Sequence, residues 1–243
     1  MSIPFVTKRV VDRYDVKIPK YLAEYHDWWG TWEKFRFESM EANLKPGDIL
    51  FDVGAEIGWI SAIYARFVGA ENMVMFEPVP NNWTMIREIW SQNGLPLPYQ
   101  CVVALVSDKT VSSTPDFDQS QHDGWPSTAF GTLLTDRNFR YIHEHAATTP
   151  QLTIDDFVAT TKIVPDALTI DIEGAELLAL KGAEATLRMR NLLVWVSVHP
   201  EMMAQNYTPT KPQDVLDFMG SLGYDCTHLG YDHEDHWFFQ RKP

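Results

Sequence analysis

Short apolar runs that alternate with helical stretches constrain the fold of this chain most strongly. Five runs are short and mostly apolar, as is typical of strands buried on both faces of a sheet: residues 49–53, 73–76, 101–106, 166–172 and 192–198. The stretches between the first three runs repeat apolar residues at helical spacing, as with Trp83, Ile86 and Trp90. Two more strands are expected near the C-terminus, around residues 223–224 and 237–240. This alternation predicts an α/β fold with a doubly wound, mostly parallel sheet.

Two segments stand outside the alternation. Residues 1–43 carry many aromatic side chains at spacings that suit helices, which predicts an N-terminal helical cover packed on a main domain of residues 44–243. Residues 108–150 are polar and loop-like, and an excursion of that length predicts an insertion or lid on the side where a substrate would bind. Trp125, within this excursion, is a candidate to stack on a ring of that substrate, with ordinary packing as the alternative.

Charge and cysteine content exclude several classes of function. The 243 residues include 33 Asp and Glu against 20 Lys and Arg, a net charge of −13, which disfavours nucleic acid and anionic membranes as partners. Two cysteines are too few for a disulfide framework or a Cys-rich zinc site, and Cys101 is expected to be a buried thiol. Without a membrane-length apolar run or a signal-peptide pattern near the N-terminus, we expect a cytoplasmic protein.

The end of the first strand carries a glycine loop suited to a cofactor. Gly54 allows a sharp turn and Gly58 allows the next helix to pack closely, while Glu77, at the end of the second strand, could accept hydrogen bonds from ribose hydroxyls. A dinucleotide loop would have a second glycine where Glu56 stands. Asp52 and Glu56 also place negative charge beside the pocket, which suits an ammonium or sulfonium ligand better than a diphosphate. These features favour S-adenosylmethionine as the cofactor.

Polar residues at the ends of the fourth and fifth strands complete the candidate site. Asp171, Glu173 and His199 are expected to converge on the sheet edge that carries Gly54. They could form a general base, a divalent-metal site or both, although Glu173 could simply cap a helix and His199 could make a structural hydrogen bond. A divalent metal is therefore possible but not predicted.

Other polar motifs carry less weight. His233-Glu234-Asp235-His236 could suggest a metal site but is better interpreted as an exposed hairpin turn, and His143 and His145 are undecided. Tyr207 and Lys211 match the acid–base pair of some dehydrogenases, which needs a helix that Pro209 and Pro212 disfavour.

Together these segments resemble the FkbM family of S-adenosylmethionine-dependent methyltransferases, which has the class I methyltransferase fold. The resemblance rests on DVGAEIGW at 52–59, FEP at 76–78, LTIDDF at 152–157, IDIEGAELLALKGAEATL at 170–187 and VHP at 198–200, and it spans residues 33–243. It implies a Rossmann-like, seven-stranded sheet with one antiparallel edge strand. It also implies methyl transfer, typically O-methylation of a hydroxyl on a sugar or natural product.

The resemblance assigns roles by position. The cofactor-binding residues it implies are Asp52, Gly54, Ala55, Glu56, Gly58, Trp59, Glu77, Pro78, Ala104, Leu105 and Asp171. Asp171, Glu173 and His199 would lie nearest the acceptor. From their expected convergence we hypothesise that His199 or Asp171 removes the hydroxyl proton while Glu173 orients its partner.

Two positions depart from the family pattern. Glu56 stands where the family usually has Asn, and Ser197 stands where it usually has an acid two residues before the histidine. These departures favour one alternative, a non-catalytic cofactor-binding module that acts as an assembly or regulatory partner. A nicotinamide-dependent oxidoreductase is a second alternative, which the glycine spacing disfavours.

Overall fold

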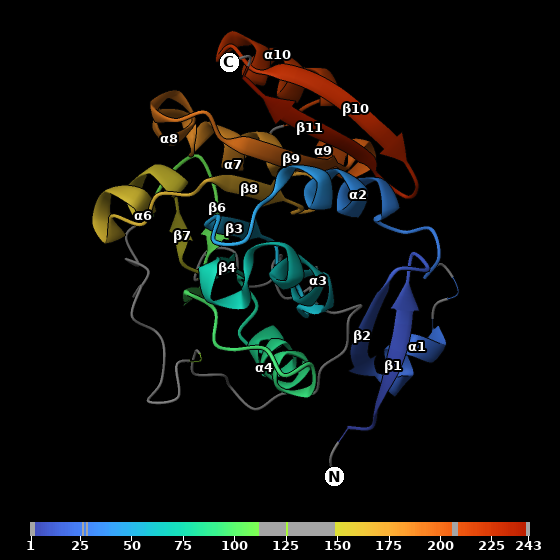
Figure 1. Cartoon of the computed structure of the whole chain (residues 1–243). Helices are drawn as coiled ribbons and strands as arrows, with labels where there is room; N and C mark the ends of the chain where they lie inside the picture. The colour runs from blue at the N-terminus through green and yellow to red at the C-terminus, as the bar shows by residue number, and fades with distance from the viewer. Residues whose placement is uncertain are drawn as a thin grey trace.

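A seven-stranded sheet lies at the centre of the molecule, as predicted (Figure 1). In this computed structural model the described residues are 3–25, 27, 29–111, 125, 149–205 and 209–241. The strands of the sheet are β3 (Leu50–Val53), β4 (Met73–Phe76), β5 (Gln100–Val102), β8 (Ala167–Ile170), β9 (Leu193–Val198), β10 (Asp225–Tyr231) and β11 (Asp235–Gln240). They lie in the order β10-β11-β9-β8-β3-β4-β5.

Strand direction brings the candidate site together. The strands β5, β4, β3, β8 and β9 are parallel to one another, so their carboxyl ends lie along one edge of the sheet. The antiparallel strand is β11, which pairs with both β9 and β10. It therefore lies one position in from the edge, and the expectation of an antiparallel edge strand is corrected.

Helices cover both faces of the sheet and enclose two separate hydrophobic cores. The first core contains side chains of α2 (Lys34–Asn43), α3 (Trp59–Val68) and α4 (Asn82–Gln92). The second contains side chains of α6 (Ile154–Thr161), α7 (Glu176–Lys181), α8 (Glu184–Met189), α9 (Pro200–Gln205) and α10 (Pro212–Ser221).

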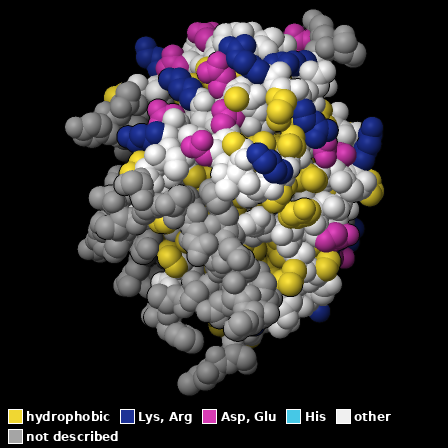
Figure 2. Space-filling view, turned by 90° about the vertical axis from the view of Figure 1, so that its left-hand side faces the viewer, with side chains coloured by type: hydrophobic (Ala, Val, Ile, Leu, Met, Phe, Trp, Pro, Cys, Tyr) yellow, Lys and Arg dark blue, Asp and Glu magenta, His cyan; other side chains and the backbone are white. Residues whose placement is uncertain are grey.

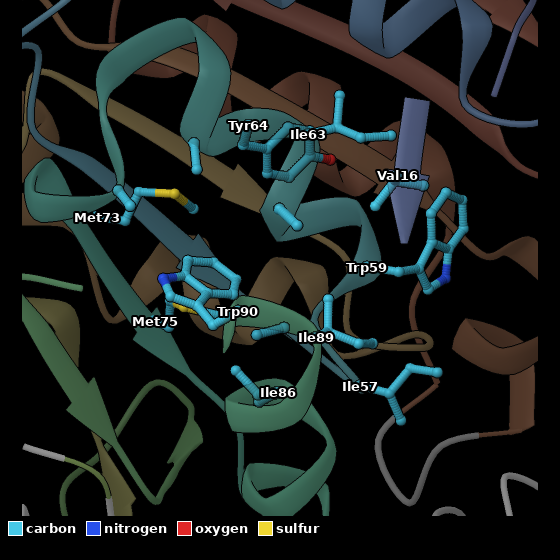
Figure 3. Packing of buried hydrophobic residues seen from close by; sticks show 14 of the residues in the cluster. Val16, Ile57, Trp59, Ile63, Tyr64, Met73, Met75, Ile86, Ile89 and Trp90 are labelled. Atoms are coloured by element: carbon cyan, nitrogen blue, oxygen red, sulfur yellow. The ribbon is translucent and has the colours of Figure 1, made fainter. Parts of the chain in front are cut away.

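The pleat of β4 shows why these residues form a central strand. Met73 and Met75 enter the first core, whereas Val74 and Phe76 enter the second, and all four side chains are buried. In the first core these methionines share a cluster with side chains of α3 and α4, among them Ile63 and Trp90 (Figure 3). Each large side chain buried in this way contributes roughly 1.5–3 kcal/mol to folding.

The N-terminal segment is only partly the helical cover that was expected. It opens with an antiparallel hairpin, β1 (Phe5–Val10) and β2 (Tyr14–Pro19), before α1 (Lys20–Tyr25) and α2 supply helices. Alternate residues Tyr14, Val16 and Ile18 of the hairpin are buried in the first core. The segment thus packs on the same face of the sheet as α3.

The strand expected over residues 101–106 is divided. After β5, the chain leaves the sheet and forms β6 (Leu105–Val106), which pairs with β7 (Gln151–Leu152) in a separate two-stranded ribbon. A short 3₁₀ helix, η1 (Ala70–Asn72), precedes β4. The lid expected over 108–150 falls mostly at 112–124 and 126–148, outside the described residues, as do His143 and His145.

Charged side chains are mixed on the face that Figure 2 displays. The basic and acidic residues described there alternate with hydrophobic side chains and do not gather into a basic patch (Figure 2). Within the described part of the chain, no helix is long and apolar enough to span a bilayer. Both cysteines are free thiols, and Cys101 is buried as predicted.

Candidate functional site

The glycine loop, residues 54–58, connects β3 to α3 and lies against the end of β8. The backbone of Gly54 has a φ of +95°, and its N–H donates to the carbonyl of Phe76 at 3.0 Å. A Cβ at this position would lie 1.9 Å from the carbonyl oxygen of Asp171. Only glycine therefore fits, and the close approach puts the loop directly beside the first residue of the acidic cluster.

Glu77 joins the end of β4 to this loop. Its Oε2 accepts the N–H of Glu56 at 2.9 Å, and its Oε1 accepts the N–H of Val79 at 2.8 Å and the amide of Asn82 at 3.1 Å. Burial raises the pKa of Glu77 to about 8, against the opposing effect of these donors. Glu77 therefore lies against the glycine loop, and its role toward a ribose stays a prediction.

The remaining residues predicted to bind the cofactor divide into two groups. Ala55 belongs to the loop and donates its N–H to Phe76. Trp59 instead packs edge-on against Trp29, with ring centres 5.3 Å apart, so its ring is part of the first core. Outside the loop, Asp52 is buried in β3, and burial raises its pKa to about 6. Pro78 follows Glu77, and Ala104 and Leu105 lie where the chain enters β6.

An acid–imidazole cluster lies at the ends of β8 and β9, as predicted. Three carboxylate oxygens approach Nε2 of His199: Oε1 of Glu234 at 3.1 Å, Oε2 of Glu173 at 3.4 Å and Oδ1 of Asp171 at 3.6 Å. On the other side of the ring, Nδ1 lies 2.8 Å from Oε1 of Glu176. His199 is 8% exposed, whereas the Glu173 side chain is 45% exposed and forms the open rim of the cluster.

Arg36 of α2 reaches the cluster from the N-terminal segment. Its guanidinium is 2.9 Å from Oδ2 of Asp171, 2.5 Å from Oε2 of Glu33 and 2.8 Å from Oγ of Ser197. Desolvation raises the pKa of Glu33 to about 7 although Arg36 lowers it. Arg36 thus fixes one oxygen of Asp171, and it contacts the serine that stands in place of the family's usual acid.

The turn between β10 and β11 supplies further charged groups. A hairpin turn was predicted here, but its expected exposure is wrong, because Glu234 is 7% exposed and His236 only 1%. Nε2 of His236 contacts Oδ1 of Asp232 at 2.9 Å, and Nδ1 of His236 contacts Oγ of Ser197 at 3.1 Å. These contacts tie the hairpin to β9.

The pKa shifts in the cluster arise because it contains more acidic than basic side chains. The surrounding carboxylates, Glu176 and Glu234 first, outweigh desolvation and raise the pKa of His199 to about 12. The neighbouring imidazoles hold the pKa of Glu234 well below its usual range, despite desolvation. Desolvation and nearby carboxylates raise the pKa of Glu173 to about 7, partly offset by His199. The cluster can therefore hold positive charge and can accept a proton at its open rim.

The sequence analysis missed three residues of this site and set a fourth aside. Glu33 and Arg36 lie in an aromatic-rich segment, and Glu176 lies inside the quoted motif without having been singled out. Glu234 was named with a possible metal motif but interpreted as part of an exposed turn. The alternation of Glu234, His236 and Phe238 with their neighbours was the sequence signal for a buried face, and the structure buries all three.

Trp125 lies apart from this cluster. It is 8% exposed and packs edge-on against Trp90, with ring centres 6.3 Å apart. The two rings, with Arg87, Ser91, Leu95 and Leu97, line a cavity of about 310 Å³ over α4. The observed contact is ordinary packing, and the stacking role for Trp125 stays a prediction.

The sequence pattern of the FkbM methyltransferase domain matches residues 52–226. The chain belongs to the FkbM methyltransferase family. The match begins at Asp52, just before the glycine loop, and includes Glu77, Asp171 and His199. It ends before the β10–β11 turn and excludes Arg36 of α2. No curated protein sequence matches the chain significantly.

Solved structures agree with the class I methyltransferase fold. A 16S rRNA methyltransferase from T. thermophilus, in complex with AdoMet and guanosine, is 13% identical with a TM-score of 0.55, over 100% of this chain and 52% of that one. A Streptococcus mutans protein described as a methyltransferase, in complex with SAH, is 8% identical with a TM-score of 0.52. The match covers 86% of this chain and 97% of that one. Methyltransferase FkbM from Methylobacillus flagellatus is 17% identical with a TM-score of 0.49, over 79% of this chain, which spans only 43% of that protein.

Proposed function

We propose that this FkbM methyltransferase transfers the methyl group of S-adenosylmethionine to a hydroxyl of a small molecule. The observation that carries the proposal is the contact between the glycine loop and the acidic cluster, where a Cβ at Gly54 would overlap the carbonyl of Asp171. A cofactor held by the loop and an acceptor held by the cluster would then be neighbours. Methyl transfer needs such a fixed alignment of donor and acceptor.

The loop residues fit the proposed cofactor. Oε2 of Glu77 accepts one hydrogen bond in this structure, and a carboxylate oxygen can accept another, here from a ribose hydroxyl. Glu56 stands where a dinucleotide-binding loop has a glycine that lets the backbone approach the diphosphate closely. S-adenosylmethionine supplies an activated methyl group, and Gly54, Ala55, Glu56, Gly58 and Glu77 are the residues we assign to holding it.

Geometry favours Glu173 as the group that accepts the acceptor's proton. His199 has carboxylates against both ring nitrogens, and Oδ2 of Asp171 is paired with Arg36. Glu173 is the most exposed member of the cluster, so an acceptor hydroxyl can reach it. This reverses the roles first hypothesised: Glu173 takes the proton, and Asp171 and His199 orient the acceptor.

The acceptor class follows from charge. A net charge of −13 and the mixed charges on the face in Figure 2 disfavour RNA, although one structural neighbour is an rRNA methyltransferase. A neutral or cationic hydroxylated compound, such as a sugar or natural product, suits the acidic cluster better. The cytoplasmic location stays a prediction from the sequence.

The cofactor assignment is tested by calorimetric titration with S-adenosylhomocysteine. We expect micromolar binding by the natural protein and loss of binding in Glu77→Gln. The matched control is Glu71→Gln, because Glu71 is an exposed acid just before the opposite end of β4 and should bind normally. Equal binding by both variants would refute the assignment.

Turnover of a panel of hydroxylated acceptors tests the chemistry. Glu173→Gln should lower kcat about 10²–10⁴-fold while the affinity for S-adenosylhomocysteine is unchanged. Unchanged turnover in Glu173→Gln would show that another group takes the proton. Cofactor binding without turnover of any acceptor would favour the non-catalytic alternative.

A further inference from the structure

One buried nitrogen in the cluster lacks the hydrogen bond that its surroundings offer. Among the described residues, Nε2 of His199 finds no hydrogen-bond partner of acceptable geometry, although carboxylate oxygens of Asp171, Glu173 and Glu234 lie within 3.6 Å. The side chain is 8% exposed, so water does not readily satisfy this nitrogen. A buried polar atom without a partner normally costs stability, and this one points into a group of anions.

The opposite side of the ring explains this orientation. Oε1 of Glu176, which is fully buried, faces Nδ1 of His199 at 2.8 Å and also accepts the N–H of Gly174. Because a carboxylate is an acceptor, Nδ1 carries a hydrogen, and Nε2 is the ring nitrogen that an ion would bind in place of a proton. A carboxylate behind the ring is the usual support for a histidine that binds a metal.

The spacing of the facing atoms fits ligands of a divalent ion. Neighbouring ligands of a six-coordinate ion with bonds of about 2.1–2.2 Å lie roughly 3.0 Å apart. Nε2 of His199 is 3.1 Å from Oε1 of Glu234 and 3.6 Å from Oδ1 of Asp171, and the three ligand atoms all lie within 4.8 Å of one another. Small movements of the two carboxylates would close this set around an ion.

We propose that Asp171 Oδ1, His199 Nε2 and Glu234 Oε1 bind a divalent transition-metal ion such as Mn²⁺. Arg36 holds Oδ2 of Asp171 and leaves Oδ1 for the ion. One imidazole with two carboxylates suits Mn²⁺ better than the all-oxygen sites that Mg²⁺ and Ca²⁺ prefer.

Glu234 lies outside the region that matches the family. The hairpin therefore supplies a carboxylate to the end of β9, where Ser197 stands in place of the family's usual acid. The cation site shares Asp171 and His199 with the proposed acceptor site and so adds to the proposed function, but its ligands are defined by the geometry above and not by the cofactor.

Mn²⁺ binding tests the site directly. Loss of the electron paramagnetic resonance signal of free Mn²⁺ should show one ion bound per chain, without cofactor or acceptor. Glu234→Gln should weaken binding at least about tenfold. The matched control is His228→Gln, which removes an exposed histidine paired with Asp235 on the same hairpin and should leave binding unchanged.

Pulsed resonance on the natural protein keeps the test independent of folding of the variants. Coupling of the bound Mn²⁺ to an imidazole nitrogen is expected, and it should persist in His233→Gln. Absence of nitrogen coupling would mean that the ion sits on surface carboxylates and would overturn the proposal. Loss of coupling in His233→Gln would place the ion among Glu33, His233 and Glu234 and would also overturn it.

Intact binding of S-adenosylhomocysteine by Glu234→Gln would show that the loss of metal is local. If the cofactor titration fails while Mn²⁺ binds as expected, the proposed function fails and the cation site stands. If S-adenosylhomocysteine binds as expected while Mn²⁺ does not bind, only the cation-site proposal is refuted.

Discussion

Replacement of Arg36 by methionine should destabilise the protein strongly. The guanidinium is 1% exposed and contacts two carboxylates, those of Glu33 and Asp171. Methionine fills much of the same volume but leaves both acids without their cation. Removal of one partner from a buried ion pair costs about 3–5 kcal/mol, which is a large part of the roughly 5–15 kcal/mol that stabilises a typical domain.

Urea unfolding gives the magnitude, and two further variants isolate its cause. Glu33→Gln combined with Arg36→Met should recover part of the loss, because one of the two orphaned acids is then neutral. Arg9→Met is the control, because Arg9 pairs with Asp15 at a site where both side chains are more than half exposed. Such an exposed pair contributes at most about 1 kcal/mol.

The losses of unfolding free energy in Arg36→Met and Arg9→Met test whether the buried ion pairs stabilise the protein. If Arg36→Met costs no more than Arg9→Met, the buried ion pairs do not hold α2 against the site. If the double variant is less stable than Arg36→Met alone, Glu33 is not the acid that needs Arg36.

Four further changes test the loop, the buried acids and the N-terminal segment. Gly54→Ala should cost about 2–4 kcal/mol in urea unfolding and abolish S-adenosylhomocysteine binding, because the new Cβ meets the Asp171 carbonyl at a positive φ. Glu56→Asn should raise stability by about 1 kcal/mol in the same assay, because Glu56 has a φ of +48° and asparagine tolerates that region better. Burial raises the pKa of Glu77 from 4.5 to about 8, so the folded protein binds this proton more tightly than the unfolded chain, and stability should fall as pH rises from 4.5 to about 8. Glu77→Gln should flatten the profile measured by thermal unfolding. A chain that begins at residue 44 should lose cooperative thermal unfolding, because α2 buries Phe37 completely; an unchanged Tm would show that the segment is a separable cover.

Local periodicity made the central sheet predictable. The strands β3 and β4 are short runs buried on both faces, and the helices α3 and α4 repeat apolar residues at helical spacing. The glycine loop was predictable for a similar reason, because Gly54 and Gly58 both have positive φ values that glycine adopts freely. Acids that follow buried strands then had to meet at one edge.

The N-terminal hairpin was harder to predict because its turn has unusual residues. Tight hairpin turns favour Asn-Gly or Asp-Gly, whereas this turn has Val11 and Asp12 at φ values of 45° and 56°. Valine is β-branched and rarely adopts that conformation, so the sequence carried no turn signal. The aromatic residues that follow, at helical spacing, made helices the stronger prediction for the whole segment.

Side-chain contacts between segments far apart in the sequence could not be predicted from local sequence patterns. Arg36 and Asp171 are 135 positions apart, and Arg36 and Ser197 are 161 apart. Nothing in the local sequence around Arg36 distinguishes a buried arginine from one on a solvated helix face. The role of Arg36 depends on where α2 packs on the sheet, and that position is defined only in the folded structure.

The electrostatics of the site explain why segments on either side of the family domain matter. Buried carboxylates cost several kcal/mol each unless cations balance them. The family region, residues 52–226, contributes three acids and only one imidazole to the cluster: Asp171, Glu173, Glu176 and His199. Arg36 then neutralises part of this charge from one flank, whereas Glu234 adds an acid from the other and leaves an excess of negative charge around His199. The flanks therefore set the local potential, and we infer that the preference of this protein for a cation or an acceptor is determined there and not in the glycine loop that it shares with other methyltransferases.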